Sequence, residues 1–324
     1  MKKVLCFAAA AMTLFASCQK TEIVYNNDGP QEISFFAVNK VATKAPIDGE
    51  IFPTTDKMNV AAYLAAGGSV GNYFGKTEFI KNGTYWTGSK YWPITQSTIN
   101  FLAVSEPQTD SPVTDITFDT SAEAKGATIQ ISGNATKQYD LMYAVGQGKC
   151  SPSSYPTVDM QFRHALTWLF FTVQSNIAGV VTVNSITVND TACDGKLTID
   201  NSSNYAATAD VNTTTATIGA SWVPTTGSKG DYPVVGTQTA CTDASTKYDF
   251  GSLLVLPTAS ESKSFTINYT LKNGSDETTF NYTYSFISDW KMSSKYTYNI
   301  TIGLTAIEIK PSVKPWTVET DVNF

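Results

Sequence analysis

The segment that decides the fold is residues 263–271, which read KSFTINYTL. Its large apolar side chains alternate with small polar ones, and a period of two is typical of a strand with one buried face. The pattern resumes after Asn273 and Gly274 in residues 280–286, which read FNYTYSF. Because Asn-Gly supplies the positive φ that a tight hairpin turn requires, the sequence predicts two antiparallel strands joined at this point.

The same alternation recurs along the chain. It is found in residues 76–80 and 84–86 around Asn82-Gly83, and in residues 97–104, 180–188 and 296–302. After the amino-terminal segment, no helical period of 3.6 residues persists for three turns. Aromatic residues make up 12% of the chain and charged residues only 15%, against about 25% charged in an average soluble protein. The expected fold class is therefore all-β.

The length of the chain indicates two domains. A chain of 324 residues accommodates two cores of roughly 150 residues each. Turn-forming residues are densest in the middle of the chain at 146–156, which read GQGKCSPSSYP, and we place the domain boundary near residue 156. The apolar run LTWLFFTV at 166–173 is expected to be a strand covered on both faces. We therefore expect an N-terminal β-sandwich over residues 45–156 and a C-terminal one over residues 157–324.

The amino terminus has the pattern of an export signal. Residues 1–17 contain two lysines, a short apolar stretch and small residues at the end, as a secretory signal peptide does. Residues 14–18, LFASC, are similar to a bacterial lipobox, which predicts cleavage between Ser17 and Cys18 and acylation of Cys18 with chains such as palmitate. The expected location is an outer membrane lipoprotein at the cell surface. An ordinary secretory cleavage beside an incidental cysteine is the alternative.

Composition argues against several function classes. The formal charge of −6 disfavours a nucleic-acid partner, because binding to phosphates needs a basic face. His164 is the only histidine, which removes most zinc sites and Ser-His-Asp triads, and we expect a packed imidazole there. Cys150, Cys193 and Cys241 are expected to be buried free thiols, although one disulfide stays open. We predict no enzyme activity, no cofactor and no metal site.

Several short motifs occur in an order that resembles the fimbrillin family, the subunits of type V pili of Bacteroidetes. They are ISF at 33–35, TKA at 43–45, YWP at 91–93, DLMYA at 140–144, FRHAL at 162–166, YTYNI at 296–300 and VKPW at 313–316. The resemblance implies two transthyretin-like Greek-key β-sandwich domains in tandem. It also implies assembly with other pilin subunits, as a homopolymer or heteropolymer, into a surface fimbria that contributes to adhesion.

The resemblance further implies that the first strand of the N-terminal sandwich is removable. In the family, a protease cuts after export, and a strand from a neighbouring subunit fills the groove by β-augmentation. Here the lipidated segment would be residues 18–44, and its strand would present Ile33, Phe35 and Ala37 on one side.

Cleavage of this strand is expected between Lys44 and Ala45. Lysine departs from the arginine usual in the family, and the two side chains are not equivalent to a protease. If Lys44 is not cut, the subunit keeps its own first strand and would resemble an anchor or cap.

The carboxyl end offers a candidate donor strand. Residues 306–324 include Val313, Trp316 and Val318, and Pro311 and Pro315 restrict such a segment to edge or extended positions. The alternative is that the segment is only the last strand of its own domain.

A rival function is a non-polymerising surface lipoprotein, or a pilus-tip adhesin, that binds host or bacterial glycans. A sugar-stacking platform could involve the aromatic side chains at 85, 86, 91 and 92, although core packing is the expected role of these residues. Asp190-Thr191-Ala192 resembles an O-glycosylation acceptor pattern of the same bacterial group.

Overall fold

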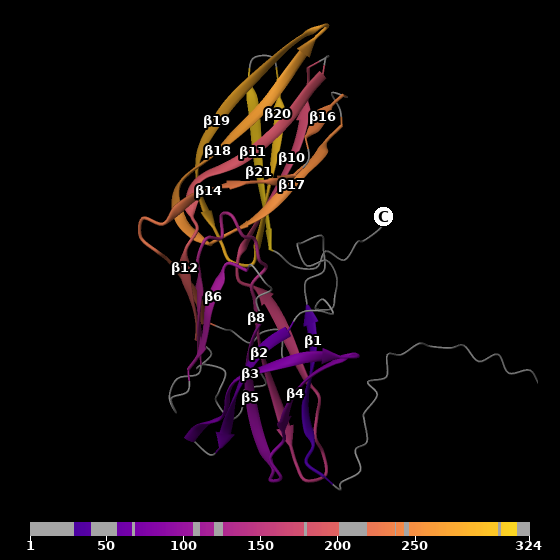
Figure 1. Ribbon diagram of the computed structural model, residues 1–324, viewed down its shortest axis with the longest axis vertical. Helices are drawn as coiled ribbons and strands as arrows, with labels where there is room; N and C mark the ends of the chain where they lie inside the picture. The colour runs from indigo at the N-terminus through magenta and orange to yellow at the C-terminus, as the bar shows by residue number, and fades with distance from the viewer. Residues whose placement is uncertain are drawn as a thin grey trace, which may run out of the picture.

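A computed structural model shows an elongated, all-β molecule with no helix among the residues it describes (Figure 1). These residues are 29–39, 57–66, 69–105, 111–119, 126–177, 180–200, 219–236, 238–242, 246–303 and 306–315. Within these ranges the chain therefore lacks any helix that could cross a membrane. The amino-terminal strands lie at one end of the long axis and the carboxyl-terminal strands at the other (Figure 1).

Seven strands of the amino-terminal part form a sheet that closes on itself. In spatial order they are β1 (Glu32–Asn39), β4 (Tyr85–Tyr91), β3 (Ser69–Asn82), β2 (Lys57–Ala66), β5 (Ser97–Ser105), β8 (Met142–Cys150) and β9 (Val158–His164). Their inward side chains form an aromatic-rich core that includes Phe35, Phe79, Trp86 and Phe101. We refer to this sheet as the barrel.

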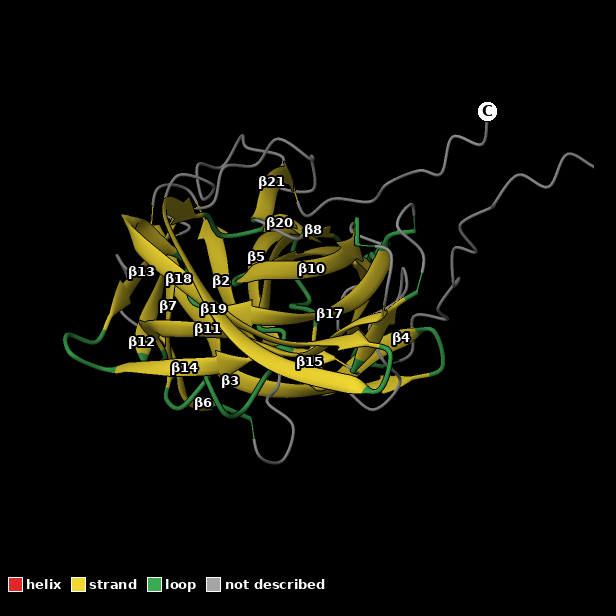
Figure 2. Ribbon diagram, turned by 90° about the horizontal axis from the view of Figure 1, so that it is seen from above, coloured by secondary structure: helices red, strands yellow, loops and turns green. Residues whose placement is uncertain are grey.

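Two sheets of the carboxyl-terminal part pack face to face as a sandwich. One contains β15 (Val235–Gly236), β17 (Tyr248–Val255), β10 (Thr167–Ser175), β20 (Ser294–Ile302) and β21 (Ile307–Pro315). The other contains β14 (Lys229–Pro233), β11 (Val180–Ala192), β18 (Thr258–Asn273) and β19 (Asp276–Trp290), with β16 (Thr239–Cys241) also paired to β11. Phe171, Phe265 and Tyr298 meet in the core between them. Figure 2 shows these strands from above.

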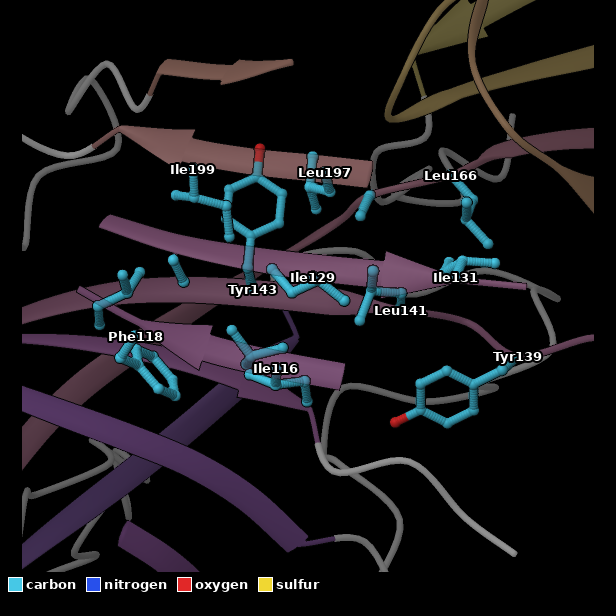
Figure 3. Packing of buried hydrophobic residues seen from close by; sticks show 14 of the residues in the cluster. Ile116, Phe118, Ile129, Ile131, Tyr139, Leu141, Tyr143, Leu166, Leu197 and Ile199 are labelled. Carbon is cyan, nitrogen blue, oxygen red and sulfur yellow. The ribbon is translucent and has the colours of Figure 1, made fainter. Parts of the chain in front are cut away.

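A fourth sheet combines strands from the two halves of the chain. It runs β13 (Gly219–Pro224), β12 (Gly195–Asp200), β7 (Gly126–Ile131) and β6 (Val113–Phe118). β7 and β12 pair along their whole length, from Gly126 opposite Asp200 to Ile131 opposite Gly195. Figure 3 shows the buried side chains of this region, where Ile116 and Ile129 lie near Leu197 and Ile199. The halves therefore share one continuous core at their junction.

The strand predictions are confirmed. Residues 263–271 lie in β18, and the turn to β19 has Gly274 at a φ of 64°. The run at 166–173 supplies most of β10, whose Trp168 faces the junction core while Leu169 and Phe171 face the sandwich core. Coverage of both faces accounts for the unbroken apolar stretch at 168–171 in this strand.

The proposed division into domains stays a prediction, and strand pairing adds detail to it. β9 lies beyond residue 156, but its partners are β1 and β8 of the barrel. β12 and β13 also lie beyond residue 156, and β12 pairs with β7 from the amino-terminal half.

Candidate functional site

β1 completes the barrel between two strands that are distant in the sequence. It pairs antiparallel with β4, with Phe35 opposite Trp86, and parallel with β9, where Phe35 lies opposite Val158. The parallel register continues to Ala37, which lies opposite Met160. Without β1, the facing edges of β4 and β9 would therefore have no strand between them.

The side chains of β1 are part of the barrel core. Ile33 and Phe35 are fully buried. The Phe35 ring makes edge-to-face contacts with Phe79 and Phe101, each with ring centroids 4.9 Å apart. Burial of each such side chain contributes about 1.5–3 kcal/mol, so β1 contributes substantially to the stability of the barrel.

Polar contacts hold the start of β1 in place. The backbone N–H of Ser89 donates a 2.8 Å hydrogen bond to Oε1 of Glu32, and the backbone N–H of Trp92 donates to the carbonyl of Gln31. On the opposite side, the hydroxyls of Ser34 and Thr157 lie 3.1 Å apart. These contacts are few, and most of the attachment of β1 comes from backbone pairing and aromatic packing.

The second half of the chain repeats this arrangement with β10. Like β1, β10 lies between an antiparallel neighbour, β17, and a parallel neighbour, β20. β10 follows β9 and precedes β11 in the chain, so it is covalently joined to a neighbouring strand at each of its two ends. β1 is joined to the next strand only through residues 40–56, which lie outside the described residues and contain Lys44 and Ala45.

The predicted donor segment begins in an edge strand. β21 pairs with β20 along its length, from Ile307 opposite Ile302 to Pro315 opposite Ser294. Val313 lies opposite Tyr296 and is 57% exposed, and only Ile309 of this strand is buried. Trp316 and Val318 lie outside the described residues, as do Ser17 and Cys18.

A groove separates β21 from β19, the edge strand of the facing sheet. It has a volume of about 500 Å³. Its apolar and aromatic lining comes from Tyr284, Phe286 and Ile287 of β19, Tyr296 and Tyr298 of β20, and Pro311 and Val313 of β21, and its polar lining is Ser288, Asp289 and Lys291. Both tyrosine hydroxyls of β20 are engaged, because that of Tyr296 donates to the Asp289 carbonyl and that of Tyr298 accepts from Trp290. The groove therefore presents aromatic and aliphatic surface together with the polar residues near the end of β19.

His164 is a packed residue, as expected. Its Nδ1 lies 2.8 Å from Oδ1 of Asp140, and both side chains are buried where the barrel meets the sandwich. Its carbonyl accepts a hydrogen bond from the hydroxyl of Ser293, which follows β19. The histidine therefore belongs to a structural junction.

Of the four aromatic residues considered for sugar stacking, the two tryptophans belong to the core, whereas Tyr91 is 45% exposed. Trp86 is fully buried and Trp92 is 4% exposed, both in the barrel core. Core packing is therefore confirmed for these two rings. Thr191 is also buried, at 1% exposure, so its hydroxyl is not accessible for glycosylation in the folded chain.

The cysteines of the described part of the chain are free thiols, and Cys150 and Cys241 are buried. Burial raises the pKa of both, that of Cys241 to about 11. The described residues contain no cluster of histidine, cysteine and carboxylate side chains that could hold a metal ion.

The sequence reasoning missed the importance of β9. Val158, Met160 and Phe162 alternate with polar residues and supply core positions next to β1. This alternation was a usable signal for a strand. Because the turn-rich residues 146–156 precede it, however, the strand was assigned to the second domain.

Comparisons with known proteins agree with this architecture. A family model described as fimbrillin-like matches residues 41–316. A fimbrial protein from Bacteroides vulgatus ATCC 8482 is similar in structure, with a TM-score of 0.58 at 15% identity, covering 80% of this chain and 93% of that one. A candidate cell adhesion protein from Bacteroides ovatus ATCC 8483 has a TM-score of 0.51 at 13% identity, covering 90% and 99%. No curated protein matches the chain.

Proposed function

Because this chain belongs to the fimbrillin-like family, we propose that it is a structural subunit of a cell-surface fimbria that assembles by protease-triggered strand exchange and contributes to adhesion. Its partners are other pilin subunits. It reaches the surface as an outer membrane lipoprotein anchored through Cys18. A structural role without catalysis agrees with the family.

The observation that carries the proposal is the position of Phe35. This ring is fully buried between β4 and β9, yet its strand is joined to the barrel only through the segment that contains Lys44. After a cut between Lys44 and Ala45, β1 is held by non-covalent contacts alone. Its departure opens two strand edges and an apolar groove, and such edges pair readily with another strand.

The carboxyl end supports the role of donor. β21 is paired on one side and its last six residues are exposed, so little apolar burial opposes its release. Beyond it, Trp316, Val318 and Val322 are separated by two and four residues. In a strand, residues separated by an even number of positions lie on the same face, so these three side chains would form one apolar face. Insertion of these side chains in place of Ile33 and Phe35 would restore the buried contacts of the barrel.

Limited proteolysis of paired variants tests this function. We expect lysine-specific cleavage of the purified exported chain to produce ladders of SDS-resistant oligomers whose subunits begin at Ala45. Because Lys40 and Lys44 are the two lysines between β1 and the first residue of β2, the double variant Lys40→Gln/Lys44→Gln should abolish the ladder. The single variant Lys40→Gln is the matched control and should leave it unchanged. Ladders that persist in the double variant, or a cleaved protein that stays monomeric, would contradict the proposal.

A further inference from the structure

The outer edge of β19 is unusually open to pairing. β18 pairs with one side of β19 from Asn273 opposite Asp276 to Thr258 opposite Trp290, and no described strand pairs with the other side. Residues 278–288 of this edge read TTFNYTYSFIS, without a charge or a proline. Soluble proteins commonly protect edge strands with lysine, proline or bulges, because unprotected edges associate. β19 has no such protection over eleven residues.

The strand across the groove differs in this respect. β21 contains Pro311 and Pro315, which lack an N–H, and the charged residues Lys310 and Lys314. Proline cannot donate to a ladder, so the edge of β21 is poorly suited to accept another strand. Of the two rims of the groove, β19 is therefore the one that can pair.

The core behind β19 is incompletely covered. Tyr282, Tyr284 and Phe286 pack against the sandwich core but stay only partly buried. On the opposite face of the strand, Ile287 is 77% exposed. By contrast, the sheet of the barrel has no open edge, because β1 lies between β4 and β9 and closes it. An additional strand beside β19 would cover apolar surface that the monomer leaves open.

Between Thr279 and Thr283, the outer face of this sheet carries an uncharged polar ladder, which ends toward the turn at the Lys272–Glu277 ion pair. Side-chain pairs of the same kind lie opposite each other on β18 and β19. The hydroxyls of Thr266 and Thr283 are 3.2 Å apart, and Asn268 Nδ2 donates a 2.8 Å hydrogen bond to Asn281 Oδ1. A further strand with hydroxyl and amide side chains could continue this ladder without placing charges opposite one another.

We propose that this edge is an interface with a second copy of the chain, in which two β19 strands pair antiparallel about a two-fold axis centred on Tyr284. In this register Thr283 faces Ser285 of the other copy and Tyr282 faces its Phe286. Glu277 then faces Lys291, which directly follows β19. A register centred on Thr283 would instead place Glu277 opposite Asp289, and like charges directly opposite are destabilising. Charge complementarity therefore selects the first register.

This interface lies in the carboxyl-terminal sandwich and does not use β1 or Lys44. Association through β19 therefore does not depend on strand exchange, and failure of one proposal leaves the other standing. A two-fold contact of this kind is closed and would join chains in pairs.

Disulfide cross-linking tests the register. The experiment uses the exported chain with Cys18→Ser and Cys193→Ser, so that the remaining native thiols are the buried Cys150 and Cys241. An equimolar mixture of Thr283→Cys and Ser285→Cys should form a heterodimeric disulfide at least about tenfold faster than a mixture of Thr283→Cys and Thr279→Cys, because only directly opposite residues have Cβ atoms near enough. Equal rates in the two mixtures, or no cross-link, would overturn the proposal.

Light scattering after size exclusion tests the interface without new cysteines. The exported chain with Cys18→Ser should form a dimer, and Ser285→Lys should convert it to a monomer with an unchanged circular dichroism spectrum. Thr297→Lys, a matched change on the outer side of the inner strand β20, should remain dimeric. A monomeric parent chain, or a dimer that persists in Ser285→Lys, would overturn the proposal.

The carboxyl-terminal tail is the competing occupant of this edge. Deletion of residues 316–324 should leave the cross-linking rate of Thr283→Cys with Ser285→Cys unchanged. A tenfold rise on deletion would mean that the tail covers β19 within one chain, and this too would overturn the proposal.

Discussion

The indole N–H of Trp222 donates a 2.6 Å hydrogen bond to the carbonyl oxygen of Ala165. Trp222 lies on β13, at the edge of the sheet that the two halves share, and Ala165 lies in the short connection between β9 and β10. The bond therefore ties the shared sheet to the point where the chain passes from the barrel to the sandwich.

Removal of this hydrogen bond should weaken the junction. Trp222→Phe keeps an aromatic ring but removes the donor, and an unsatisfied carbonyl in a buried setting costs about 1–3 kcal/mol. We expect the free energy of unfolding in urea to fall by that amount. Val223→Ala is the matched control, because Val223 on the same strand is 62% exposed and surface changes alter stability by about 0.5 kcal/mol or less. Equal effects of the two variants would contradict this role.

Truncation of the central ring of β1 should destabilise the barrel. Phe35→Ala removes two edge-to-face contacts and leaves a cavity, and such changes typically cost about 3–5 kcal/mol. Urea denaturation followed by tryptophan fluorescence measures the loss, because Trp86 and Trp92 lie in the same core. Phe36→Ala, a half-buried neighbour, should cost less. A loss below about 1 kcal/mol for Phe35→Ala would mean that β1 contributes little to the fold.

The cysteines should differ in reactivity. Burial raises the pKa of Cys150 and raises that of Cys241 to about 11, and the reactive form of cysteine is the thiolate. In a Cys18→Ser variant of the exported chain, we expect a thiol reagent at pH 8 to modify Cys193 first. Cys150 and Cys241 should react only after denaturation. Mass spectrometry of labelled peptides distinguishes the three sites, and rapid native labelling of Cys241 would be contrary to its burial.

Asp194 should make stability depend on acid pH. A hydrogen bond from Ser228 is the main cause that lowers the pKa of this carboxyl, and the backbone N–H of Gly133 also donates to it. A carboxyl with a lowered folded-state pKa stabilises the fold above its ordinary value of about 3.9, and the contribution is lost as the pH falls through the folded value.

Two variants test this prediction. Asp194→Asn should reduce stability at pH 7 and make the decline below about pH 4 shallower. Ser228→Ala removes the main hydrogen bond to the carboxylate and should shift the curve in the same direction. Thermal unfolding midpoints across this pH range provide the measurement. Parallel curves for the parent chain and Asp194→Asn would show that this carboxylate is not involved.

Local patterns in the sequence were sufficient to predict individual strands. The alternation at 263–271 and the Asn-Gly turns identified β18, β19, β3 and β4, because side-chain period and turn conformation depend on residues close together in the chain. The continuous apolar run at 166–173 likewise predicted a strand covered on both faces. The removable first strand came from a family resemblance, and its proposed role is still to be tested.

The arrangement of sheets could not be predicted in this way. β7 and β12 pair across about seventy residues of chain, and β1 pairs with β9 across more than one hundred. Such pairings depend on which hydrophobic faces meet, and a short segment contains no information about a distant partner. The turn-rich residues at 146–156 consequently looked like a boundary, although β8 and β9 on either side of them are neighbours in the barrel.

The amino-acid sequence by itself determined that this chain is made of strands and where most of them lie, because alternation and turn chemistry act over a few residues. Only the tertiary structure decided that β1 closes the barrel between β4 and β9, that the halves share a sheet, and that β19 has an open edge. Those features arise from burial and backbone pairing between segments that are far apart in the chain. Such contacts form only when the whole chain folds.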